Sequence, residues 1–197
     1  MSNSIILASA SPRRKQLLGM LYADMRIIPS SVDEPAPNGQ KPSDYAMELA
    51  RLKATDVAVN YPESLVIGSD TIVVLKDRIL GKPSGPEEAF SILRHLSGQT
   101  HTVVSAVCLV LKGDDSRVFF ESTSVTFAEL SDTEINRYIA TGSPLDKAGA
   151  YGIQDDLGAL FVSRIEGDYY NVVGFPLHRF YTELKDFAPE YRPKALS

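Results

Sequence analysis

Short apolar segments alternate with helical patterns along this 197-residue chain, and this alternation restricts the fold more than any other feature. Segments 5–8, 65–67 and 72–75 are rich in β-branched residues and typical of buried strands. Two longer apolar runs, 101–111 and 118–127, predict an antiparallel hairpin around Gly113-Asp114-Asp115. Further elements are expected as strands at 25–29 and 160–165 and helices at 12–21, 43–59, 86–96, 131–140 and 176–184, with a capping box of Ser131 and Glu134 at the start of the fourth helix. A loop is expected at 143–152 and a turn at 167–171. The pattern predicts an α/β fold with a mixed twisted sheet and flanking helices, in which ligands bind in a cleft at strand ends.

Composition favours one globular domain without long nucleic-acid partners. Hydrophobic residues make up 44% of the chain, which predicts a single domain over residues 1–188 and a loose polar tail over 189–197. The net charge of −5 opposes binding of long nucleic acid. The N-terminus lacks signal-peptide features and no run of about 20 apolar residues occurs, so a cytoplasmic protein with no membrane contact is predicted.

A basic cluster stands where the first strand is expected to lead into a helix. Ser11 is placed to cap that helix, and Ser9, Arg13 and Arg14 surround its N-terminus. The N-terminal amides and the arginines together suit a phosphate group. Three consecutive cations, ending at Lys15, oppose the helix dipole. They lower the stability of the helix unless an anion binds there. The alternative is an ordinary capped helix with a solvated basic first turn.

A carboxylate lies between two apolar runs that read as core strands. The polar segment Gly68-Ser69-Asp70-Thr71 is expected to interrupt the strand, and burial of Asp70 alone would be unfavourable. A metal ion, a lysine or a shifted pKa would relieve that cost. Glu34, beside Asp33 on a loop, would complete a hard-metal site with Asp70. The alternatives, an aspartate that caps a turn and a solvated acidic pair, remain open.

Two lysines and one loop complete the candidate residues. Lys53, on an expected helix, and Lys82, in Gly81-Lys82-Pro83, taken singly read as surface lysines. The segment 146–154 places small residues around charged groups, so its backbone can approach a ligand closely. Gln154 at its end has both donor and acceptor groups, as reading a base edge requires, and the alternative is an exposed surface glutamine.

Five motifs occur along the chain in a specific order. They are Ser9-Ala10-Ser11-Pro12-Arg13-Arg14, Gly68-Ser69-Asp70-Thr71, Gly81-Lys82-Pro83, Ser97-Gly98 with His101, and Asp146-Lys147-Ala148-Gly149-Ala150-Tyr151-Gly152-Ile153-Gln154. Together they closely resemble the Maf family of nucleoside triphosphate pyrophosphatases, from about Ile5 to Leu184. The last motif is similar to that of the branch acting on dTTP and UTP.

The resemblance implies a fold with a central cleft, shared with inosine triphosphate pyrophosphatases, a homodimer, and a need for Mg²⁺ or Mn²⁺. It implies hydrolysis of a nucleoside triphosphate to the monophosphate and pyrophosphate, with roles in nucleotide house-cleaning and cell-division arrest. By the same resemblance Asp70 is the proton acceptor. The specificity positions are Arg13, Thr71 and Gln154, and the triphosphate and metal positions are Ser9, Arg14, Glu34, Lys53 and Lys82.

One departure and two rival functions stay open. Asp155-Asp156 stands where relatives commonly have Gly, which affects the loop shape and the base preference. A nucleotide sensor without turnover and an inosine or xanthosine triphosphate hydrolase are the rivals. A carboxylate among cations favours the mechanism in which Asp70 helps to activate water for attack at the α-phosphorus.

Overall fold

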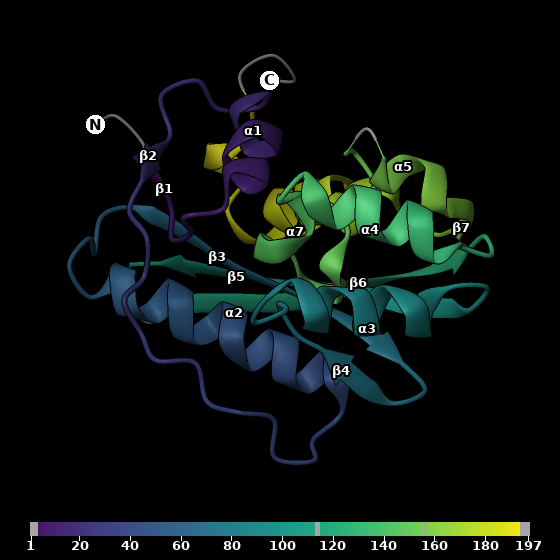
Figure 1. Ribbon diagram of the computed structural model, residues 1–197. Helices are drawn as coiled ribbons and strands as arrows, with labels where there is room; N and C mark the ends of the chain where they lie inside the picture. The colour runs from purple at the N-terminus through teal and green to yellow at the C-terminus, as the bar shows by residue number, and fades with distance from the viewer. Residues whose placement is uncertain (1–3, 113–114, 156, 194–197) are drawn as a thin grey trace. The chain divides into compact units, whose positions relative to one another are not determined.

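The structure is a computed structural model that describes residues 4–112, 115–155 and 157–193 (Figure 1). Its strands and helices, in chain order, are β1 Ile5–Leu7, α1 Pro12–Gly19, β2 Arg26–Ile27, α2 Pro42–Ala58, β3 Leu65–Leu75, β4 Arg78–Leu80, α3 Pro86–Leu96, β5 Thr100–Leu111, β6 Asp115–Phe127, α4 Asp132–Ala140, α5 Gly158–Phe161, β7 Val162–Glu166, α6 Tyr169–Val173 and α7 Leu177–Phe187. The strands are hydrogen-bonded in the order β2-β1-β3-β5-β6-β7, and β4 pairs with β3. Parallel β1–β3 and antiparallel β6–β7 pairs make the sheet mixed, so the predicted α/β class is confirmed.

The chain divides into two compact units. The first unit comprises Met1–Asp70, Ser105–Glu121 and Gly174–Ser197, and the second comprises Thr71–Val104 and Ser122–Val173. The single domain over residues 1–188 therefore stays a prediction. Among the described residues, no helix has both the length and the apolar character needed to span a bilayer.

In the first unit, β1 lies between β2 and the start of β3, parallel to both. As predicted, Ser11 caps α1, because its side chain accepts a hydrogen bond from the Arg14 amide, and a proline occupies the first turn. Leu17 and Leu18 bury the inner face of this helix. The β1–α1 turn thus takes the form that the sequence predicted for the basic cluster.

The expected break at residues 68–71 is wrong, since β3 runs continuously from Leu65 to Leu75. The cause is Gly68. A Cβ atom at this position would lie 2.3 Å from the Ala50 carbonyl oxygen and 2.7 Å from the Ala54 Cβ, so α2 packs directly on the strand backbone. The glycine thus allows α2 to approach a strand that continues through Asp70.

In the second unit, α3 packs against α4. The capping box predicted at the start of α4 is confirmed, with reciprocal hydrogen bonds between Ser131 and Glu134. The strand expected from residue 160 begins only at Val162, because α5 takes the preceding residues. Helix α6 replaces an expected turn, and the buried Asn171 fixes it by donating to the Val103 carbonyl and the Thr123 hydroxyl.

Two expected loops have more structure than the sequence indicated. Residues 143–152 contain the 3-10 turns Ser143–Asp146 and Ala148–Ala150. In the polar tail, Pro189–Tyr191 forms another 3-10 turn with Tyr191 buried, whereas residues 194–197 lie outside the described part. The expected hairpin turn at residues 113–115 also falls largely outside the described part, although β5 and β6 are neighbours in the sheet.

Candidate active site

The N-terminus of α1 carries a buried arginine. The Arg14 guanidinium donates through Nη1 to Ser9 Oγ at 3.2 Å and through Nε to the Gly174 carbonyl at 3.1 Å. Burial lowers the pKa of Arg14, and the negative charges of Asp70 and Glu34 oppose that shift. An arginine remains protonated at neutral pH even so. The structure therefore places a fixed positive charge inside this unit, which a merely solvated basic turn would not do.

Asp70 meets a lysine from α2. Lys53 Nζ lies 2.6 Å from Asp70 Oδ1 and 2.7 Å from Glu34 Oε1. The whole Asp70 residue is only 8% exposed, whereas the Glu34 side chain is half exposed. A lysine partner is thus what makes burial of the Asp70 carboxylate tolerable, one of the three alternatives that the sequence left open. Three predicted residues, far apart in the sequence, come together here.

Helix α2 also holds the loop that carries Glu34. The Tyr45 hydroxyl donates to the Pro35 carbonyl at 2.9 Å. Burial raises the pKa of Tyr45, and the nearby charges of Asp70 and Glu34 raise it further. Sequence reasoning missed Tyr45. The available signal was its position eight residues before Lys53, which places both on one face of the helix.

The two carboxylates are a partial ligand set for a hard cation. Among the described residues, no group of three or more His, Cys, Asp or Glu side chains is placed to hold a metal. Mg²⁺, however, is commonly held by one or two carboxylates together with substrate phosphates and water. Glu34 and Asp70, which share the Lys53 ammonium, fit that kind of site.

Four further predicted residues are not among the side chains that the Lys53 ion pairs join. Arg13 is half-buried in the first turn of α1. Thr71, the first residue of the second unit, follows Asp70 directly and is also half-buried. Lys82 and Gln154, both in the second unit, are exposed. Exposed side chains of this kind are accessible to a ligand.

Close packing joins two motifs of the second unit. The Gly149 amide donates to the Gly81 carbonyl at 3.1 Å, so the segment before Lys82 lies against the 146–154 loop. Gly149 has φ of 69°, and a Cβ there would lie 2.8 Å from the Val73 side chain. The glycine is therefore required by both its conformation and its contact with β3.

His101 supports the same loop from inside. It is 2% exposed, and its Nε2 lies 2.7 Å from the Tyr151 hydroxyl, with Phe127 packed edge-on against both rings. Burial lowers the pKa of His101 to about 4, so the ring is neutral at pH 7. The motif histidine thus holds the loop as a neutral hydrogen-bonding group.

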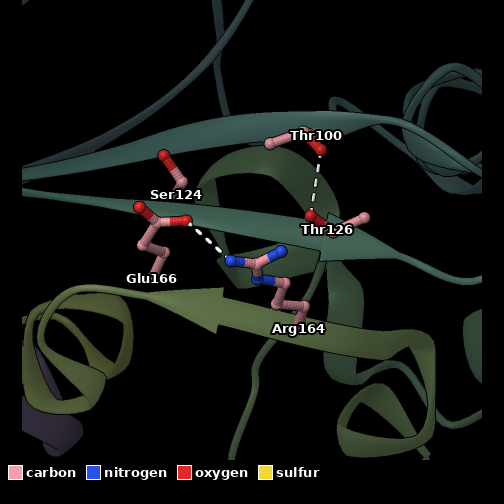
Figure 2. A pocket seen from close by; sticks show the side chains of 5 residues that line it. All are labelled: Thr100, Ser124, Thr126, Arg164 and Glu166. Carbon is pink, nitrogen blue, oxygen red and sulfur yellow. Dashed lines mark hydrogen bonds and ion pairs between the residues drawn. The ribbon is translucent and has the colours of Figure 1, made fainter.

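A pocket in the second unit lies on β5, β6 and β7 (Figure 2). Its lining consists of Thr100, Ser124, Thr126, Arg164 and Glu166. Arg164 and Glu166 form an ion pair at 3.1 Å, and both side chains are more than 70% exposed. None of the predicted site residues lines this pocket, and its arginine, Arg164, already pairs with the exposed Glu166. We therefore do not assign the active site to this pocket.

Comparison with known proteins matches the chain to the family described as Maf-like protein over residues 4–187. The chain belongs to this family. A Bacillus cereus protein named dTTP/UTP pyrophosphatase is 51% identical over 183 residues, covering 93% of this chain and 95% of that protein. A Bacillus anthracis protein of the same name is 50% identical with the same coverage. The family resemblance and its dTTP/UTP branch, predicted from the motifs, are thereby confirmed.

Among solved structures, a HAM1 protein from Coxiella burnetii is similar in fold. It has a TM-score of 0.51 and 14% sequence identity, and the match covers 93% of this chain and 99% of that one. At this identity the likeness concerns the fold alone. It agrees with the predicted mixed α/β architecture.

Proposed function

We propose that this Maf-like protein is a nucleoside triphosphate pyrophosphatase that converts dTTP and UTP to the monophosphate and pyrophosphate. The observation that carries the proposal is the buried Asp70 carboxylate of β3, which pairs with Lys53. Lys53 also pairs with Glu34. The activity printed in the names of relatives about 50% identical supports the same reaction.

The chemical step uses the residues of the first unit. Arg14, Lys53 and the amides at the start of α1 bind the triphosphate oxygens. The Asp70 carboxylate accepts a proton from a water molecule, which attacks the α-phosphorus. The bond from the α-phosphorus to the bridging oxygen breaks, and pyrophosphate leaves with the bonding electrons. A Mg²⁺ or Mn²⁺ ion bound by Glu34 and Asp70 would supply further neutralisation of the phosphate charge.

Base recognition is the role we assign to the specificity positions of the family. Arg13, Thr71 and Gln154 carry side chains that donate or accept hydrogen bonds. The Gln154 amide offers one donor and one acceptor, which matches the adjacent O4 and N3–H groups of thymine and uracil. Lys82 adds a cation for phosphate. These roles rest on the family motifs, and each needs its own test.

The proposal is tested with a panel of nucleotides. Purified protein is incubated with dTTP, UTP, dCTP, CTP, ITP and XTP with Mg²⁺ or Mn²⁺ and with a chelator, and monophosphate, pyrophosphate and orthophosphate are quantified. We expect pyrophosphate from dTTP and UTP, at kcat/KM at least about tenfold above the cytosine nucleotides. Tight binding without release would instead support a sensor, and preference for ITP or XTP would support the other hydrolase class.

Two wider properties are proposed from the family alone. The chain acts as a homodimer, which light scattering on the purified protein tests directly. Removal of unwanted pyrimidine nucleotides and an effect on cell division would follow from the activity, and a strain lacking the gene, complemented by active and inactive variants, distinguishes catalysis from binding in those roles.

A further inference from the structure

Asp155, directly after Gln154, is held by a network that the family motifs did not predict. Its carboxylate accepts hydrogen bonds from the Tyr138 hydroxyl at 2.9 Å and the Ser143 hydroxyl at 2.6 Å, and its Oδ2 lies 3.2 Å from Lys147 Nζ. The Asp155 side chain is 18% exposed. All four residues belong to the second unit. A carboxylate with three donors is strongly fixed.

The ion pair closes the base of the 147–155 loop. Lys147 is buried and stands at the start of the loop, and Asp155 stands at its end. Lys147 Nζ also donates to the Ser143 carbonyl at 2.5 Å and lies 2.8 Å from Asp146. The two ends of the segment that carries Gln154 are therefore tied to each other and to the preceding 3-10 turn.

Tyr138 links this closure to the backbone inside the loop. Its hydroxyl donates to Asp155 and accepts from the Gly152 amide at 3.0 Å. A Cβ on Gly152 would lie 2.6 Å from Asp155 Oδ2, and one on Gly158 would lie 2.3 Å from the Gly152 carbonyl oxygen. The Gly152 backbone thus packs closely against the Asp155 carboxylate and the Gly158 backbone.

Gln154 itself has no such support. Its side chain is exposed and makes no hydrogen bond within the described residues. Its position depends on the backbone on either side, and the Asp155 network fixes that backbone. We infer that Asp155 is a positioning residue that sets base discrimination by fixing the 147–155 loop; the inference rests on the proposed function.

The test separates positioning from plain stabilisation of the fold. Asp155→Ala removes all three contacts, whereas Asp155→Asn keeps an acceptor for Tyr138 or Ser143 and loses the charge opposite Lys147. The matched control is Arg164→Ala, which removes an exposed ion pair of the same unit. For each variant, kcat and KM are measured for dTTP, UTP, dCTP and CTP well below its unfolding temperature.

We expect Asp155→Ala to lower the thymine-over-cytosine ratio of kcat/KM by about tenfold, because a misplaced recognition group loses its selective contacts. The change should appear mainly in KM for dTTP and UTP, while kcat stays within about threefold. Asp155→Asn should fall between Asp155→Ala and the parent protein, and Arg164→Ala should match the parent. Faster amide exchange over residues 147–155 in Asp155→Ala should accompany the lost selectivity.

Two results would overturn the inference. One is a folded Asp155→Ala with the parent ratio, and the other is an equal loss of activity on every base, which indicates a structural role only. If Asp155→Ala does not fold, Asp155→Asn decides by the same ratio. If the parent protein releases no pyrophosphate, the proposed function fails separately, and the ratio of dissociation constants for dTTP and dCTP then decides the positioning role.

Discussion

Each unit contains a lysine between two carboxylates, yet the two clusters differ in how many protein donors the more buried carboxylate has. Lys53 lies between Asp70 and Glu34, and Lys147 lies between Asp146 and Asp155. Asp155 also accepts from the hydroxyls of Tyr138 and Ser143. In the part of the chain that the structure describes, the Asp70 side chain hydrogen-bonds only to Lys53.

The difference separates a reactive carboxylate from a structural one. Asp70 has one donor, the Lys53 ammonium on Oδ1, whereas Oδ2 of Asp155 takes three donors from the protein. The first cluster is also fixed by a helix packed on a strand, and the second by side-chain hydrogen bonds at the base of a loop. The two clusters have similar ion pairs, but we expect different functions. Substitution of Asp70 should lower kcat, and substitution of Asp155 should lower selectivity between bases.

The largest effect should follow Asp70→Asn. Loss of the proton acceptor is expected to lower kcat for dTTP by about 10²–10⁴-fold with the base ratio unchanged. The matched variant is Asp155→Asn, whose kcat should stay within about threefold of the parent. Steady-state kinetics with pyrophosphate detection measures both. Near-normal turnover by folded Asp70→Asn would remove the distinction drawn between the two carboxylates.

Gly68→Ala tests how packing of α2 places Lys53. The added methyl would meet the Ala50 carbonyl and the Ala54 side chain, so α2 must move away from β3. We expect a loss of about 1–3 kcal/mol in the free energy of unfolding, the usual cost of overpacking, and a lower kcat because Lys53 moves with the helix. Urea unfolding measures the first and kinetics the second.

Gly19→Ala is the control in the same unit, since nothing lies within 4 Å of a Cβ there. It should leave stability unchanged or raise it by up to about 1 kcal/mol. A Gly68→Ala protein as stable and active as the Gly19→Ala protein would show that close helix packing does not set the position of Lys53.

Local patterns in the sequence predicted the parts of the fold that depend on neighbouring residues. The Ser11 cap and the Ser131–Glu134 capping box were both correct, because each involves backbone and side chains within one turn. The motifs also predicted Lys53, Asp70 and Glu34 as site residues, and the three side chains lie together in the structure. In each case the residues involved are close together in the sequence or belong to a family motif.

Contacts between distant residues were not accessible in that way. Arg14 is held by the carbonyl of Gly174, 160 positions away, and no periodicity identifies such a partner. The close packing of α2 on Gly68 joins separate segments of the chain, and the strand pattern alone indicated a break in β3. Asp155 appeared only as a departure from relatives, since its donors come from α4 and from the turn at residues 143–147.

The smallest effect is expected from Tyr45→Phe, which removes one hydroxyl from the charged cluster. Loss of the hydrogen bond to the Pro35 carbonyl should cost about 0.5–1.5 kcal/mol and loosen the loop that carries Glu34. We expect a rise of about threefold in the concentration of Mg²⁺ needed for half-maximal activity, with kcat and the base ratio nearly unchanged. Tyr61→Phe is the control, because the Tyr61 hydroxyl makes no hydrogen bond within the described residues and its ring contact with Arg26 is kept. If Tyr45→Phe instead lost selectivity between bases, the Lys53 cluster would also govern base recognition. The distinction between the Lys53 and Lys147 clusters would then be wrong.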